Sequence, residues 1–246
     1  MEIFIGKTYE LMCRKALEKI VELTAFNTLP LLCTASGDTP AGLYKQLVSG
    51  VNQKKIDVSN WLFISLDEWM GMNGNDEGSC RFHLNYQLFV PLEVKDEQIS
   101  FFDGKAKDPL KECERVENFI SKNGGIDIAI VGIGMNGHVG MNEPGTLPQL
   151  RSHVTEIHNE TQEIGQKYFK EKQQLTQGIT LGLANLLDAR NVILLASGQH
   201  KAAIIKQVLE GEITDKLPAS ILRNHPALHI FLDKDAASLL QPEHIK

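Results

Sequence analysis

Short, unbroken apolar runs alternate along this chain with longer segments of helical period, and this alternation constrains the fold more than any other feature. The runs 62–66 and 192–196 have the length of strands and show no alternation of polar and apolar residues. Such runs are typical of strands buried on both faces of a sheet. The segments 109–122 and 199–209 have the apolar spacing of helices that cover such a sheet.

Further strand-length runs occur at 30–33, 126–133 and 229–232. Strands joined by helices imply right-handed crossovers. We therefore predict an α/β fold with a doubly wound, mainly parallel, Rossmann-like sheet and helices on both faces, in a single domain over residues 1–246. The Gly-rich segments 67–79 and 135–150 follow the carboxyl ends of predicted strands, where open α/β sheets bind ligands.

The composition is that of an ordinary globular protein, with 42% hydrophobic and 23% charged residues among 246. No apolar run approaches the ~20 residues needed to cross a bilayer, and the start of the chain does not resemble a signal peptide. A formal net charge of −6 disfavours non-specific nucleic-acid binding, which needs a basic surface. We expect a cytoplasmic protein that binds a small molecule, with neither nucleic acid nor membrane as a partner.

Neither the cysteines nor the histidines form a cofactor pattern. His225 and His229 have the i, i+4 spacing of helical metal ligands, but Pro226 prevents that helix. We therefore expect no bound metal. The cysteines are far apart and contain no CxxC pair, so we expect buried, reduced thiols at Cys13, Cys33, Cys80 and Cys113.

The segment Ser36, Gly37, Asp38, Thr39 and Pro40 joins a predicted strand to a predicted helix. Pro40 suits the first helical position and Thr39 the N-cap, so free backbone N–H groups would form an anion site there. The alternative is an ordinary turn that binds nothing. If a phosphate binds here, the Asp38 side chain must point away, because a carboxylate repels it.

The segment 132–137 matches G-x-G-x-x-G after a strand, which by itself suggests a dinucleotide site. Gly140, Pro144 and Pro148 prevent the helix that should follow, so we reject that interpretation and expect no cofactor. The same loop holds Asn136, His138, Asn142 and Glu143. A histidine near a carboxylate in an ordered loop can transfer protons near neutral pH, whereas a lone loop histidine is usually solvated.

Asp67 and Glu68 follow the strand 62–66 and precede Trp69. Carboxylates at a strand end can act as general bases, and an adjacent indole can exclude water and raise their pKa. In the alternative interpretation, Asp67 caps the next segment and Glu68 is exposed. The residues alone leave both interpretations open.

Together, the segments 36–40 (SGDTP), 66–69 (LDEW) and 132–145 (GIGMNGHVGMNEPG) resemble the amino-sugar-6-phosphate deaminase/isomerase family, a resemblance that covers most of the chain. The G-H-x-x-x-N-E-P stretch is its most specific part. The segment 178–183 looks closest to the bacterial galactosamine-6-phosphate isomerase branch.

The resemblance implies a reaction without a cofactor. His138, supported by Glu143 and Asn136, opens the sugar ring, and Asp67 then moves a proton from C2 toward C1. Water hydrolyses the resulting C2 imine to a ketose 6-phosphate and ammonia. The favoured substrate is galactosamine 6-phosphate, giving tagatose 6-phosphate, in amino-sugar catabolism. Glucosamine 6-phosphate, giving fructose 6-phosphate, is the alternative.

The same resemblance assigns the phosphate to the 36–39 loop, Lys201 and Lys167. Lys167 replaces an arginine that is usual in the glucosamine branch, which loses a bidentate contact. Asn136 stands where some members have an aspartate, so it orients His138 instead of acting as a base. His153 and Thr155 stand at the effector positions of regulated hexameric members, so we expect no such activation.

Two further functions remain open. The related 6-phosphogluconolactonases share the phosphate loop and a Gly-His loop, but Val139 to Pro144 after His138 favours the deaminating isomerase. A non-catalytic sugar-phosphate sensor would not need Asp67, His138 and Glu143 together. The sequence is compatible with a homo-oligomer.

Overall fold

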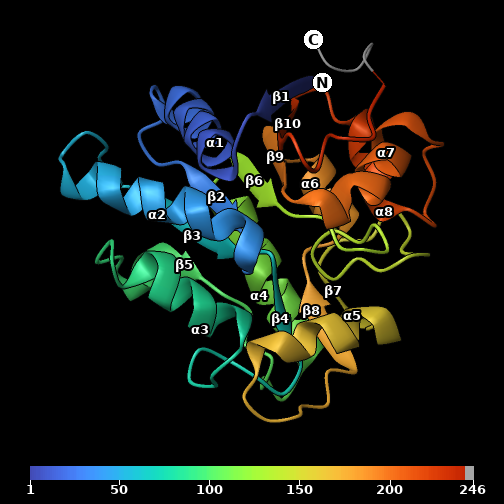
Figure 1. Ribbon diagram of the computed structural model, residues 1–246. Coiled ribbons are helices and arrows are strands. Elements are labelled where there is room, and N and C mark those ends of the chain that lie inside the picture. The colour runs from blue at the N-terminus through green and yellow to red at the C-terminus, as the bar shows by residue number, and fades with distance from the viewer. Residues whose placement is uncertain (242–246) are drawn as a thin grey trace.

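The centre of the molecule is a seven-stranded sheet in the order β1-β10-β9-β6-β2-β3-β5, in a computed structural model that describes residues 1–241 (Figure 1). Each neighbouring pair of strands is parallel. Its strands are β1 (Glu2–Gly6), β2 (Leu31–Thr34), β3 (Leu62–Ser65), β5 (Ile99–Ser100), β6 (Ile128–Val131), β9 (Asn191–Ala196) and β10 (Leu228–Asp233).

Helices cover both faces of this sheet, as the apolar runs predict. Successive residues of each central strand face opposite cores: Leu31 and Cys33 of β2 belong to one, and Leu32 between them to the other. The first core is closed by α4, α6, α7 and α8, and the second by α1, α2 and α3. The helices are α1 (Tyr9–Thr24), α2 (Asp38–Asn52), α3 (Cys80–Leu84), α4 (Pro109–Lys122), α5 (Asn159–Gly165), α6 (Leu183–Leu187), α7 (Ala202–Glu210) and α8 (Pro218–Ile221).

The predicted doubly wound parallel fold is confirmed. Helix α4 has the bounds expected from its apolar spacing, and Asp108 caps it by accepting hydrogen bonds from the backbone N–H groups of Leu110 and Lys111. The predicted helix 199–209 begins instead with a 3₁₀ turn, η4 (Gln199–Lys201), and continues as α7. None of the helices described within residues 1–241 is long and apolar enough to cross a membrane.

A second, three-stranded sheet lies beside the main one in the order β4-β8-β7 (Figure 1). Its antiparallel strands are β4 (Asp67–Trp69), β8 (Gln177–Thr180) and β7 (His153–Glu156). A single residue, Leu66, separates β3 from β4, so the chain leaves the parallel sheet and pairs with β8 at once. Asp67 lies directly opposite Thr180 in this pairing.

Four adjacent strands, β9, β6, β2 and β3, end at the same edge of the main sheet. The segments that follow them contain Lys201 and the motifs at 132–145, 36–40 and 66–69. The parallel topology therefore brings together motifs that are far apart in sequence. This is the edge where open α/β sheets bind ligands.

Candidate active site

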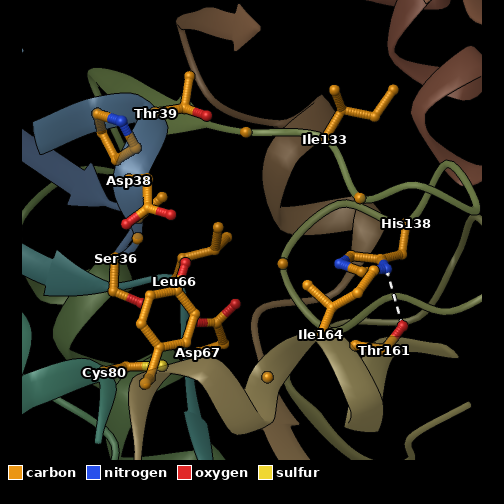
Figure 2. A pocket seen from close by; sticks show the side chains of 18 of the residues that line it. Ser36, Asp38, Thr39, Leu66, Asp67, Cys80, Ile133, His138, Thr161 and Ile164 are labelled. Carbon is orange, nitrogen blue, oxygen red and sulfur yellow. Dashed lines mark hydrogen bonds between the residues drawn. The ribbon is translucent and has the colours of Figure 1, made fainter. Parts of the chain in front are cut away.

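A cavity of about 760 Å³ opens at this carboxyl edge. Figure 2 shows Ser36, Asp38 and Asp67 on one side of it and His138 and Thr161 on the other. Eight of the predicted site residues line it: Ser36, Gly37, Asp38, Thr39, Asp67, His138, Lys167 and Lys201. The other two, Asn136 and Glu143, lie behind His138 and reach the cavity only through it.

The loop between β2 and α2 presents backbone N–H groups to the cavity. The predicted N-cap at Thr39 is wrong, because α2 begins at Asp38 and its N-cap is Gly37, which has φ +109°. Glycine adopts this conformation without the steric cost that a side chain brings. No side chain caps the first turn, so its N–H groups and the positive end of the helix dipole remain available to an anion.

Two tyrosines hold this loop in place. The Tyr9 hydroxyl lies 3.0 Å from the Asp38 carbonyl oxygen and 2.9 Å from that of Thr39, and it accepts from the Gly42 N–H at 2.7 Å. The buried Tyr44 hydroxyl donates to the Ala35 carbonyl oxygen at 2.7 Å. The loop is therefore fixed before any ligand arrives.

Two lysines reach the cavity from different elements. Lys201 Nζ donates to the Ile133 carbonyl oxygen at 2.7 Å, and burial together with the charge of Lys167 lowers its pKa to about 8. Lys167, in the 3₁₀ turn η3 (Gln166–Tyr168), lies 2.6 Å from Asp38 Oδ2. The Asp38 side chain is exposed, and the charge of Lys167 partly neutralises its carboxylate. This neutralisation reduces the repulsion between Asp38 and an anion bound in the loop.

The two acidic residues after β3 have different environments. Asp67 lines the cavity, and burial raises its pKa to about 6. Glu68 is fully buried, and burial raises its pKa to about 7. The interpretation in which Glu68 is exposed is wrong, because its carboxylate accepts hydrogen bonds from the backbone N–H groups of Trp69, Cys80 and Arg81. Only Asp67 of the pair can meet a ligand.

His138 belongs to a short chain of hydrogen bonds. Asn136 Nδ2 donates to Glu143 Oε2 at 2.7 Å, and Asn136 Oδ1 lies 2.7 Å from His138 Nδ1. Because Oδ1 can only accept, Nδ1 carries the proton and Nε2 is left as an acceptor. Burial lowers the pKa of His138, against the opposing effect of the Glu143 charge. The neutral imidazole is therefore the resting form at neutral pH.

Sequence reasoning missed Thr161, whose hydroxyl lies 3.2 Å from His138 Nδ1 and 3.4 Å from Asn136 Nδ2. It comes from α5, which with η3 closes one side of the cavity. Nothing in the sequence near Thr161 marks it, since it follows Asn159 and Glu160 in an unremarkable polar segment. As predicted, no helix directly follows the segment 132–137.

The four cysteines within the described chain are free and buried, as predicted. Cys80 alone among them lines the cavity. Its thiol pKa is raised well above the usual value by burial, so it is not a thiolate nucleophile. Within residues 1–241, no group of three or more histidine, cysteine or acidic side chains could hold a metal ion.

A family model described as glucosamine-6-phosphate isomerases/6-phosphogluconolactonase matches residues 8–230. The glucosamine-6-phosphate deaminase of Thermoanaerobacter pseudethanolicus is 36% identical over 247 residues, covering 100% of this chain and 98% of that protein. The protein of the same name from Bacillus velezensis is 34% identical over 238 residues, covering 96% of this chain and 99% of that protein.

Two solved structures are similar to this chain, the first in sequence and fold and the second in fold. A structure described as a monomeric glucosamine-6-phosphate deaminase has a TM-score of 0.93 at 32% identity, covering 97% of this chain and 100% of that one. A 6-phosphogluconolactonase from Trypanosoma brucei has a TM-score of 0.74 at 21% identity and shares the fold, with 98% of each chain covered. The resemblance that the sequence motifs indicate is confirmed, and this chain belongs to the glucosamine-6-phosphate isomerase/6-phosphogluconolactonase family.

Proposed function

We propose that the protein is an amino-sugar-6-phosphate deaminase that converts glucosamine 6-phosphate into fructose 6-phosphate and ammonia. The observation that carries this proposal is one cavity lined by an anion loop, two lysines, a buried carboxylate and a neutral histidine. The curated relatives named above are called glucosamine-6-phosphate deaminases. The sequence-based preference for galactosamine 6-phosphate has no support from them, so we replace it with the glucosamine alternative.

The phosphate would occupy the loop between β2 and α2. Ser36, Thr39 and Lys201 all line the cavity, and no side chain caps the N–H groups of the first turn of α2. A phosphate dianion would raise the lowered pKa of Lys201 and hold the lysine in its charged form. Lys167 would add a second charge from η3 on leaving or sharing its contact with Asp38.

His138 would open the sugar ring. The hydrogen-bond chain leaves Nε2 as an acceptor, so it can take the proton from the C1 hydroxyl and return it to the ring oxygen. Ring opening thus needs no net proton from solvent. Glu143 acts through Asn136, since it holds the amide that orients the imidazole.

Asp67 would carry out the carbon chemistry. As a carboxylate it takes the C2 proton of the open-chain amino aldose, while a proton from the protonated amino group passes to the C1 oxygen, which leaves a C1–C2 enolamine. Returning the C2 proton from Asp67 to C1 gives a protonated C2 imine and a C1 hydroxymethyl group. Water then adds to C2 and ammonia leaves, which yields the ketose. A raised pKa suits this role, because the carboxylate is a stronger base than an exposed one.

The test is ammonia release from glucosamine 6-phosphate and galactosamine 6-phosphate, measured side by side with purified protein. We expect a higher kcat/KM for the glucosamine substrate. Activity on the galactosamine substrate alone would contradict glucosamine 6-phosphate as the substrate, but the protein would still be an amino-sugar-6-phosphate deaminase. Consumption of 6-phosphogluconolactone without ammonia release from either amino sugar would instead identify a hydrolase and overturn the proposal.

A further inference from the structure

The hydroxyl of Thr180 has no part in the mechanism above, although it lies between the two segments that supply the proton-transfer groups. Thr180 is the last residue of β8, it is fully buried, and it lies directly opposite Asp67 in the pairing of β8 with β4. It does not line the cavity. Any effect of this hydroxyl on the reaction must therefore pass through the residues that it contacts.

The first contact is with the residue before Asp67. Thr180 Oγ1 lies 3.3 Å from the Leu66 carbonyl oxygen and 3.0 Å from that of Leu181, and its single proton can be donated to either. The Leu66 carbonyl oxygen also accepts from the Leu181 N–H at 2.8 Å. The segment that carries Asp67 is therefore held against the end of β8.

The second contact is with the turn between His138 and Glu143. The same hydroxyl oxygen accepts from the Met141 N–H at 3.2 Å. One residue further along, Asn142 Nδ2 donates to the Leu181 carbonyl oxygen at 2.9 Å. The turn that connects the histidine to its supporting carboxylate is therefore attached to the same end of β8.

This turn also fits closely against β8. Gly140 has φ +60°, and a Cβ atom at this position would lie 2.9 Å from Thr180 Oγ1 and 3.1 Å from Leu66 Cγ. At Gly178, two residues earlier in β8, a Cβ atom would overlap Met141 Sδ. Two glycines thus allow the turn to approach the strand, and the hydroxyl holds the turn there through the Met141 N–H.

We propose that Thr180 is a positioning residue whose hydroxyl fixes the placement of Asp67 relative to His138 by joining the segments that carry them. This inference rests on the proposed function, in which the two side chains act on one sugar from different sides of the cavity (Figure 2). Each must lie within hydrogen-bond reach of the proton it moves, and a displacement of about 1 Å can reduce the rate about a hundredfold. A threonine that only filled the core could be replaced by valine without such a loss of rate.

The experiment compares Thr180→Val, which keeps the branched shape but removes the hydroxyl, with Thr180→Ser, which keeps the hydroxyl. In the valine variant the Met141 N–H loses its acceptor, so we expect the turn to shift and kcat for ammonia release to fall roughly ten- to a hundredfold. KM and the inhibition constant of inorganic phosphate should stay close to wild type, because the loop between β2 and α2 is not altered. The serine variant should recover most of the lost kcat.

Thr24→Val is the matched control. The Thr24 hydroxyl is also buried and donates to the Ile20 carbonyl oxygen at 2.9 Å, but it lies on α1 and outside the cavity lining. This variant should keep wild-type kcat. Thr180→Ala takes the place of the valine variant if the latter does not fold. Wild-type kcat in the variant without the hydroxyl, an equal loss in Thr24→Val, or a serine variant as impaired as the valine one would each overturn the inference.

A wild-type protein without deaminase activity would instead overturn the proposed function. In that case NMR still measures the placement of the turn. In Thr180→Val, the Met141 amide proton should exchange with solvent faster and the ring resonances of His138 should shift, whereas Thr180→Ser should resemble wild type in both. Unchanged Met141 exchange and unchanged His138 resonances in the valine variant would refute the inference without any activity measurement.

Discussion

The side-chain amide of Asn136 donates a hydrogen bond to Glu143 at 2.7 Å, and this contact fixes which end of the amide faces His138. A carboxylate can only accept, so the amide nitrogen must point toward it. The amide oxygen then points at Nδ1, 2.7 Å away, and sets the tautomer of the imidazole. Glu143 therefore determines, through Asn136, which nitrogen of His138 carries the proton, although its nearer oxygen is 3.8 Å from Nδ1.

The variant Glu143→Gln tests whether Glu143 sets the tautomer of His138. A glutamine can donate as well as accept, so it permits the Asn136 amide to reverse and present its nitrogen to Nδ1. That reversal moves the imidazole proton to Nε2, the wrong nitrogen for taking a proton from substrate. We expect kcat for ammonia release to fall by about 10²–10⁴-fold, the usual contribution of a general base, and the ¹⁵N resonances of His138 to report the other tautomer.

Glu163→Gln on α5 is the matched control, because its side chain is exposed and outside the cavity lining. It should keep wild-type kcat. A Glu143→Gln enzyme with normal kcat and the Nδ1–H tautomer would show that Asn136 alone orients His138.

Lys201→Ala tests the phosphate site. The variant loses a charge-assisted contact to a dianion in a partly desolvated site. We expect KM to rise ten- to a hundredfold, which corresponds to about 1.5–3 kcal/mol. Lys206→Ala, five residues further along the chain and paired with Glu210 at 3.4 Å, removes the same charge outside the cavity. Equal KM values for the two variants would remove Lys201 from the substrate site.

Asp67→Asn should stabilise the protein while removing activity. The folded-state pKa of Asp67 is raised to about 6, so the unfolded chain ionises first as the pH rises. The unfolded state then binds fewer protons, and wild type loses stability between roughly pH 4 and pH 6. Above that window the buried charge remains a cost, which asparagine avoids. We expect Asp67→Asn to exceed wild type in unfolding free energy by about 1–3 kcal/mol at pH 8.

At pH 3 the Asp67 carboxyl group is largely protonated in both the folded and the unfolded state, so most of the extra stability of Asp67→Asn should disappear. Asp76→Asn is the control of opposite sign, since the hydrogen bond from Lys105 lowers the pKa of Asp76. Its stability should not increase with pH relative to wild type. Denaturant titrations at both pH values measure the differences, and an Asp67→Asn protein no more stable than wild type at pH 8 would refute the raised pKa.

The main sheet was predictable because its central strands are buried on both faces. The runs 62–66 and 192–196 contain β3 and β9, and their apolar residues belong alternately to the two cores. The second sheet was not predictable from such runs. β4 consists of Asp67, Glu68 and Trp69, and β7 is only partly buried, so neither has a strand-like apolar pattern. Both depend on pairing with β8, a contact between distant parts of the chain.

The residues of the candidate site also differ in whether the sequence predicts them. Residues in ordered strand–loop motifs, such as Asp67 and His138, could be chosen from the sequence because glycines, prolines and apolar strands mark their position. Thr161 and Cys80 could not, since each reaches the cavity through tertiary packing of a helix with no motif of its own. The Thr39 N-cap failed for a local reason: the positive φ of Gly37 starts the helix earlier than the Thr-Pro pair suggests.

The two proton-transfer roles can be separated by hydrogen exchange at carbon. Asp67→Asn keeps size and polarity but removes the base, so exchange of solvent deuterium into the sugar should stop. His138→Gln should slow ring opening yet spare exchange on substrate that is already in the open-chain form. Both variants are incubated in heavy water with fructose 6-phosphate and ammonia, and deuterium at carbon is followed by NMR. Each loss should be about 10²–10⁴-fold in the step concerned.

Asp67 and His138 lie on different sides of the cavity, and this separation is why two distinct defects are expected (Figure 2). In the proposed mechanism, one side of the sugar meets the carboxylate at C1 and C2, and the other presents its ring oxygen to the imidazole. If Asp67→Asn incorporates deuterium at the wild-type rate, Asp67 is not the base. Glu68 does not line the cavity, and its oxygens already accept three backbone N–H groups, so the replacement would have to come from another cavity residue.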